Sequence, residues 1–149
     1  MQNFQEFLEN SLQQNIKKLV PLTGGASADI NRIILENNNE LIVRRSLSKE
    51  QSVMAVPKKL EAKIQRIVRS NDAPVPEIIF EFSEDEDIGE GYVMEAIPGE
   101  TIPRKILRDD KYKNVRSKLS FEIGRSLATI HQTKLDELTD LDSVTFEES

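Results

Sequence analysis

The sequence predicts an α+β fold built on an antiparallel sheet, and three observations support this expectation. Short β-branched segments come in two pairs, with only a short turn or loop between the members of each pair, which favours hairpins. Helical apolar periodicity precedes, separates and follows these pairs. The chain has 149 residues, of which 38% are hydrophobic, so its length and composition suit one packed domain.

The first third of the chain predicts one helix and one hairpin. Apolar residues recur every three or four positions from about residue 4 to 18, and Asn3 with Glu6 has capping-box spacing, so an amphipathic helix is expected there. Pro21 ends the helix or begins an extended segment, and residues 22–27 form a loop of small residues. Residues 30–35 and 41–43 are strand-like and flank an asparagine turn at residues 37–39.

The remainder predicts a second helix, a second strand pair and a long third helix. Residues 57–70 carry an apolar stripe at helical spacing, and the prolines at 74 and 76 then force extended backbone. Residues 78–80 and 92–94 are short apolar strands on either side of an acidic hairpin tip. Pro98 and Gly99 mark a turn, residues 112–131 are helical, and residues 134–149 form an acidic tail with little periodicity.

Composition excludes several classes of function. The chain has no cysteine and a single histidine, His131, which excludes disulfides, thiol nucleophiles and zinc sites that need two histidines. No apolar stretch approaches the roughly 18 residues that span a bilayer, and the N-terminus does not resemble a signal peptide, so a cytoplasmic protein without membrane partners is expected. The net charge is −6, and Asp109 and Asp110 interrupt the basic stretch at residues 104–118, so nucleic-acid binding is not favoured.

Four features fall in an order that suits one nucleotide cleft. Gly24, Gly25, Ala26 and Ser27 form a segment whose backbone N–H groups can approach phosphate oxygens. Arg44 ends an apolar strand with a cation. Each feature alone also has a structural explanation: the glycines can form an ordinary turn, and the arginine can be an exposed residue at a strand end.

The other two features lie on the second helix and the last strand. Glu61 borders the buried face of its helix and needs a cation, for which Arg44 and a solvated Lys58 are the two candidates. The strand that ends at Met94 and Glu95 runs toward Ile97 and a turn, where backbone groups can meet the edge of a flat heterocycle. A plain strand exit has the same pattern.

In these segments the chain resembles the N-terminal half of the aminoglycoside-phosphotransferase-like, or choline-kinase-like, small-molecule kinases. The resemblance covers roughly residues 15–133. The matching segments are Leu22-Thr23-Gly24-Gly25-Ala26-Ser27, Leu41-Ile42-Val43-Arg44-Arg45, Glu61, Ala73-Pro74-Val75-Pro76, residues 92–100 and Leu127-Ala128-Thr129-Ile130-His131.

This resemblance implies a protein-kinase-like N-terminal lobe at residues 20–99, preceded by the helix at 1–19 and followed by the first helices of a C-terminal lobe at 100–133 and the tail at 134–149. It also implies ATP as cofactor. Gly24, Gly25, Ala26 and Ser27 would cover the phosphates, Arg44 would contact them and pair with Glu61, and Met94, Glu95 and Ile97 would form the hinge. His131 would pack or contact the helix C-terminus rather than act in catalysis.

Two features depart from the family pattern. Asp29 lies near the expected phosphate path, where its charge is unfavourable unless it points away, and an arginine replaces the commoner lysine at position 44. The H-G-D-x-x-x-x-N loop and the later metal-binding Asp are not in this sequence, so no catalytic or metal-binding residue is assigned here. A hydroxyl-bearing small-molecule substrate and magnesium would need the absent C-terminal lobe.

Two functions therefore remain open. The first is the ATP-binding half of a small-molecule phosphotransferase that is truncated in this chain. The second is a catalytically inactive kinase-like module that binds a protein partner or itself through the face that the other lobe normally covers.

Overall fold

The computed structural model describes residues 3–22, 29–47, 56–83 and 87–134. Its sheet contains β1 (Ile16–Pro21), β2 (Asp29–Leu35), β3 (Glu40–Ser46), β4 (Ile78–Ser83) and β5 (Glu90–Glu95). Its helices are α1 (Phe4–Leu12), α2 (Lys58–Ser70), α3 (Pro103–Arg108), the 3-10 helix η1 (Asp110–Tyr112) and α4 (Lys113–His131). The predicted α+β class, with an antiparallel sheet and a helix packed on it, is confirmed.

The five strands form one antiparallel sheet in the order β1-β2-β3-β5-β4. The β2–β3 and β4–β5 hairpins are the two pairs expected from the sequence. They join edge to edge through β3 and β5, where Arg44 lies opposite Tyr92 and Val43 opposite Val93. Because side chains alternate between the faces of a sheet, Arg44 and Tyr92 share one face while Val43 and Val93 share the other.

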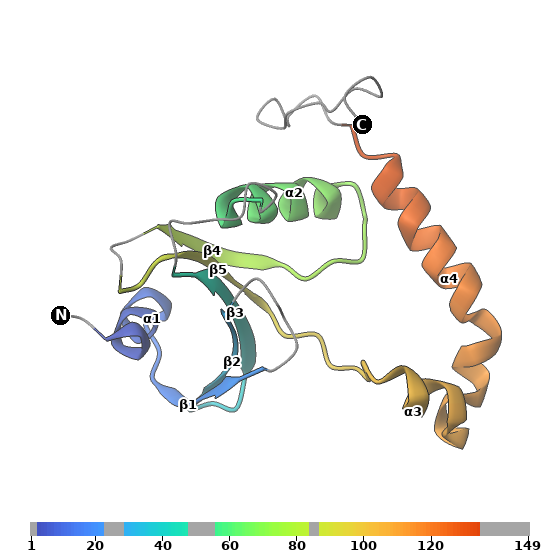
Figure 1. Cartoon of the computed structure of the whole chain (residues 1–149), viewed down its shortest axis with the longest axis horizontal. Helices are drawn as coiled ribbons and strands as arrows, with labels where there is room; N and C mark the ends of the chain where they lie inside the picture. The colour runs from blue at the N-terminus through green and yellow to red at the C-terminus, as the bar shows by residue number, and fades with distance from the viewer. Residues whose placement is uncertain (1–2, 23–28, 48–55, 84–86, 135–149) are drawn as a thin grey trace.

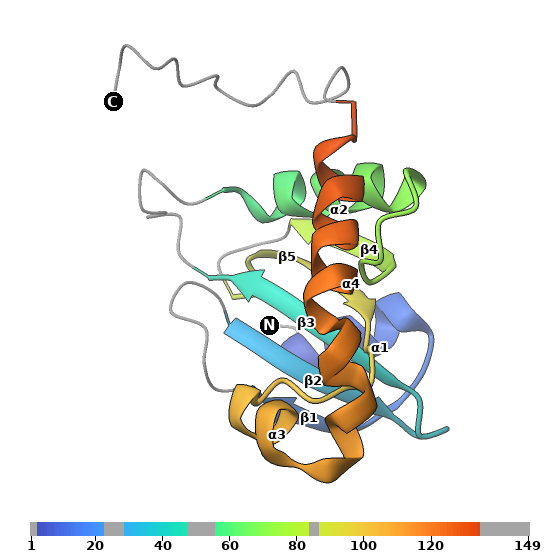
Figure 2. The ribbon, with the colours of Figure 1, turned by 90° about the vertical axis from the view of Figure 1, so that its right-hand side faces the viewer.

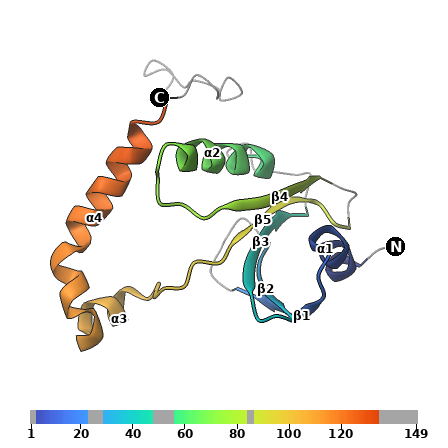
Figure 3. The ribbon, with the colours of Figure 1, turned by 180° about the vertical axis from the view of Figure 1, so that it is seen from behind.

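Each face of the sheet carries one helix, as Figures 1 and 3 show. Helix α1 lies on the concave face of the sheet, and its Leu8 is fully buried against a cluster that includes Val43, Val93 and Phe82. Helix α2 lies on the opposite side over β4 and β5, where Ala62 packs with Tyr92 in a smaller cluster. Helix α2 does not extend over β1 and β2.

The predicted continuation of the first helix to residue 18 is wrong. Helix α1 ends at Leu12, Gln13 adopts a left-handed backbone with φ 52°, and residues 16–21 form the edge strand β1. The spacing of Ile16 and Leu19 fits a helix, but Ile16 is buried against the sheet and its amide donates to the Glu9 carboxylate at 2.9 Å. Pairing with β2 satisfies the backbone of this segment, which outweighs its local helical pattern.

The long helix predicted at residues 112–131 is confirmed as α4. Pro103, at a position suited to a helix start, begins the short helix α3, which lies within the range 100–133 where the resemblance implied helices although no helical periodicity marked it. Helix α4 packs with α3 and η1, stands apart from the sheet in Figure 1 and crosses in front of it in the view of Figure 2, and is connected to β5 through the segment that includes α3. None of its 19 residues is buried.

Candidate nucleotide site

Arg44 and Glu61 meet on the α2 side of the sheet. Arg44 lies near the end of β3, and Glu61 lies in the first turn of α2. The Arg44 Nε donates to Glu61 Oε2 at 2.9 Å, and the two side chains are 28% and 22% exposed. The predicted ion pair across the helix–sheet interface is therefore present, in a partly desolvated position where it is stronger than a surface pair.

Lys58 also binds Glu61, so the two candidate partners of this carboxylate act together. The Lys58 Nζ donates to Glu61 Oε1 at 2.6 Å, while the Tyr92 hydroxyl donates to Oε2 at 3.1 Å. The expectation of a solvated Lys58 is wrong, because its side chain is only 4% exposed. Both oxygens of Glu61 are thus engaged, one by Lys58 and the other by Arg44 and Tyr92.

These contacts set the protonation of the site. Burial raises the pKa of the Glu61 carboxyl, but the hydrogen bond from Lys58 and the charges of Arg44 and Lys58 outweigh it, so the pKa lies below its ordinary value. Burial, followed by the negative charge of Glu61, raises the pKa of Tyr92 to about 12. At neutral pH, Glu61 is therefore ionised and Tyr92 is a neutral hydrogen-bond donor.

Gly24, Gly25, Ala26 and Ser27 lie outside the described residues. The residues that flank them are close together, because the Leu22 amide donates to the Ile30 carbonyl at 2.8 Å. In the sheet, Ile30 is the register partner of Arg44. The chain therefore leaves and re-enters the sheet at the same end as Arg44.

Asp29 points away from the face that carries Arg44. It lies opposite Arg45 on β3, and Arg45 Nε donates to its carboxylate at 2.7 Å. Asn31 donates to the other carboxylate oxygen at 2.8 Å, and the Arg45 guanidinium lies 3.5 Å from the centre of the Phe4 ring. The negative charge of Asp29 is thus neutralised on the α1 side, and it does not oppose an anion beside Arg44.

The strand exit after β5 forms one wall of a hollow of about 270 Å³. The hollow is lined by Arg32, Glu40, Ile42, Ala96, Ile97, Pro98 and Gly99. Ile42 lies two residues before Arg44, on the same face of β3. Of the three predicted hinge residues, only Ile97 lines this hollow, and its side chain is 56% exposed.

Met94 and Glu95 face other surroundings. The Met94 sulfur accepts from Gln65 Nε2 at 3.7 Å, and Met94 packs against the cluster that contains Ala62 and Tyr92. The Glu95 amide donates to the Glu77 carbonyl at 2.9 Å, so this N–H is already engaged. Met94 therefore supports α2, and the Glu95 amide is not available to a ligand.

Two contributors to the site were missed or misjudged from the sequence. Tyr92 was read only as part of a strand, since its place opposite Arg44 depends on pairing between distant strands. The spacing of Lys58, three residues before Glu61 on the same helix, indicates an ion pair between them, but it does not indicate that Lys58 is buried.

The described residues hold no group of three or more His, Asp or Glu side chains that could bind a metal ion. His131 is the last residue of α4 and is exposed, at the end of a helix where a cation is favourable. No helix among the described ranges is long and apolar enough to cross a membrane.

Comparison with known proteins gives one match. A family model described as "Phosphotransferase enzyme family" matches residues 18–148. No curated protein and no solved structure matches the chain.

Proposed function

Since the chain belongs to the phosphotransferase enzyme family, we propose that it is the ATP-binding half of a small-molecule kinase. Its five-stranded sheet and helices have the arrangement of a kinase-like N-terminal lobe followed by the start of a C-terminal lobe. The observation that carries the proposal is the Arg44–Glu61 ion pair, which lies on the same face as the hollow beside Ile97.

The arrangement suits a nucleotide in two ways. The hollow takes a flat base against Ile42 and the strand exit. Arg44 lies two residues after Ile42 on the same face of β3, where it can receive the phosphates. Arg44 uses Nε for Glu61, and its two terminal nitrogens have no partner among the described residues. A guanidinium fork of this kind pairs well with phosphate oxygens, and Gly24, Gly25, Ala26 and Ser27 would add backbone donors.

Transfer of the phosphoryl group needs residues that this sequence does not contain. An orienting Asp, metal-binding Asn and Asp side chains and the magnesium that they hold would come from a C-terminal lobe, together with the contacts to a hydroxyl-bearing acceptor. In the proposed role, these 149 residues bind and orient ATP, and catalysis takes place only with that second lobe.

A titration of the isotope-labelled chain with ATP, followed by amide chemical shifts, tests this function. We expect shifts at residues 24–27, at Arg44 and at residues 95–97, and we expect Arg44→Met to weaken binding by about tenfold or more. Arg108→Met, an exposed arginine on α3, is the matched control and should bind as the unchanged chain does. The proposal fails if saturating ATP moves none of these amides.

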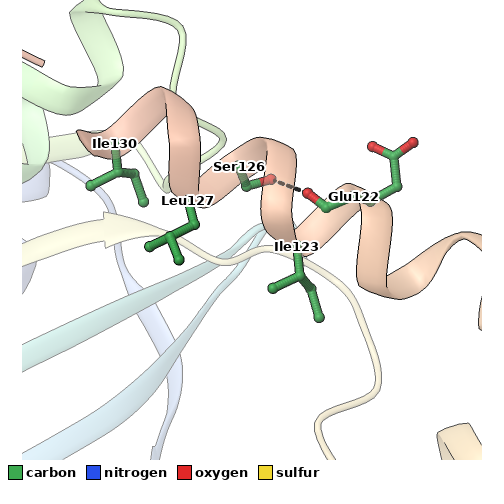
Figure 4. Close-up of a pocket in the computed structure, with 5 residues that line it drawn as sticks. All are labelled: Glu122, Ile123, Ser126, Leu127 and Ile130. Carbon is green, nitrogen blue, oxygen red and sulfur yellow. Dashed lines mark hydrogen bonds between the residues drawn. The ribbon is translucent and has the colours of Figure 1, made fainter. Parts of the chain in front are cut away.

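A second function, self-association as an inactive kinase-like module, is favoured by the surface of α4. Ile123, Leu127 and Ile130 form an apolar row on this helix, and Figure 4 shows all three side chains projecting from the same side. Their exposed fractions are 59%, 49% and 37%. Sedimentation at increasing concentration should show a dimer that Leu127→Ser disperses, and a monomer at all concentrations rules this function out.

A further inference from the structure

Lys58 is buried beside the proposed phosphate site although it is a lysine. Its side chain is 4% exposed, its ammonium contacts Glu61 Oε1 at 2.6 Å and the Val56 carbonyl at 3.5 Å, and its backbone amide donates to the Glu90 carboxylate at 3.0 Å. A lysine is almost never this buried unless its charge is compensated. Glu61 supplies the compensating charge.

The same carboxylate serves Arg44 through its other oxygen. Because Lys58 occupies Oε1 and Tyr92 contacts Oε2, Glu61 cannot turn without breaking a short hydrogen bond. The oxygen that Arg44 contacts at 2.9 Å is therefore held in a fixed direction. An arginine held by its Nε alone keeps its terminal nitrogens for a second anion.

The charge of Lys58 matters as well as its position. Arg44 and Glu61 alone form a neutral pair, which attracts a phosphate chain weakly at a distance. Lys58 adds a positive charge to this pair in a partly desolvated place, where attraction to an anion is stronger than in water, and the Glu90 carboxylate at the Lys58 backbone amide offsets part of that charge. A third charged group of this kind is not needed to stabilise a simple ion pair.

From this geometry we propose that Lys58 is a positioning residue of the nucleotide site, which holds Glu61 so that Arg44 is directed to the phosphates and which adds positive charge beside them. The inference rests on the proposed function. It assigns Lys58 an effect on the phosphate part of the ligand and none on the base, since Lys58 does not line the hollow beside Ile97.

The test compares Lys58→Met with the matched control Lys59→Met in the full chain. Lys59 is the next residue on α2 and is exposed. Calorimetric titrations with ATP, inorganic tripolyphosphate and adenosine should show that Lys58→Met weakens binding of the first two by about tenfold and leaves adenosine unchanged. Lys59→Met should bind all three as the unchanged chain does. If ATP affinity is unchanged in Lys58→Met, or if adenosine affinity falls equally, the proposed role is wrong.

A second measurement does not depend on nucleotide. A carbon NMR titration of the Glu61 carboxyl should show a higher pKa in Lys58→Met than in Lys59→Met, because the hydrogen bond and charge of Lys58 lower it. An unchanged Glu61 titration overturns the inference even if ATP binds. If the unchanged chain binds neither ATP nor tripolyphosphate, the proposed function fails, and this titration alone decides whether Lys58 holds Glu61.

Circular dichroism establishes that each variant is folded before it is titrated. Should Lys58→Met fail to fold, Lys58→Gln takes its place, because glutamine keeps a hydrogen-bond donor without the charge. The same loss of tripolyphosphate affinity is expected for this variant, and retention of full affinity refutes the role of the charge.

Discussion

Replacing Glu61 with glutamine removes a charge from between two cations and should destabilise the chain at neutral pH. The carboxylate bonds Arg44 at 2.9 Å and Lys58 at 2.6 Å, with Lys58 only 4% exposed. A charged hydrogen bond contributes about 1.5–3 kcal/mol, and leaving one buried charge unpaired costs about 3–5 kcal/mol. Glutamine still accepts one hydrogen bond and the site is partly solvated, so we expect a loss of about 2–4 kcal/mol in the free energy of unfolding.

The lowered pKa of Glu61 determines how the stability difference between the unchanged chain and Glu61→Gln varies with pH. The pKa of Glu61 is lowered in the folded chain, so its stabilisation is fully present above the ordinary carboxyl pKa and is lost as the pH falls through the lowered value. Glutamine does not titrate. The difference between the two chains should therefore be largest at neutral pH and should shrink in acid.

Urea unfolding at several pH values, followed by far-ultraviolet circular dichroism, measures this difference. Glu36→Gln, which alters an exposed carboxylate after β2, is the matched control and should change the stability by less than about 0.5 kcal/mol. The reasoning is refuted if Glu61→Gln is as stable as this control at neutral pH, or if its deficit persists unchanged in acid.

Three further predictions concern the sheet around the site. In Gly91→Ala the new Cβ would lie 2.5 Å from a backbone carbonyl oxygen of the neighbouring strand, so urea unfolding should show a loss of about 2–3 kcal/mol. Gly124→Ala on α4, with nothing within 4 Å, should lose no stability, and equal behaviour of the two variants would contradict the packing argument. Because the pKa of Tyr92 is raised to about 12, the stabilisation from its neutral phenol should be present below pH ~10 and lost as the pH rises through about 12. Ultraviolet titration should show this late ionisation, and Tyr92→Phe should abolish it; a Tyr92 ionisation near pH 10 would disprove the burial effect. Asp29→Asn should cost about 1–3 kcal/mol in urea, since the 13%-exposed side chain of Arg45 loses its anion, and an unaltered midpoint would count against that pairing.

The hairpins could be predicted because their signals are local. Residues 30–35 and 41–43 combine β-branched side chains with an asparagine turn, and both strands form with slightly longer bounds. The strand at residues 16–21 could not be separated from a helix in the same way. Ile16 and Leu19 are three residues apart, and only pairing with β2 makes the extended backbone favourable.

In the candidate site, too, features with a local signal could be predicted, and features that depend on contacts between distant segments could not. The sequence left Arg44 and Lys58 as two candidate partners of Glu61, and the family resemblance implied the Arg44–Glu61 pair that the structure contains. The burial of Lys58 and the approach of the Tyr92 hydroxyl depend on how α2 lies across β5, which spacing along the chain does not encode. The role of residues 24–27 stays a prediction.

Arg44 and Arg45 are neighbours with the same side chain, yet one pairs with Glu61 on the α2 side and the other with Asp29 on the α1 side. The two arginines bind different partners because successive side chains along β3 point to opposite faces of the sheet. Inserting one residue between the turn at residues 37–39 and Arg44 would move each guanidinium group to the opposite face of the sheet. Inserting two residues would return each group to its original face. Evolutionary changes of length in this hairpin are therefore expected inside the turn, or in pairs.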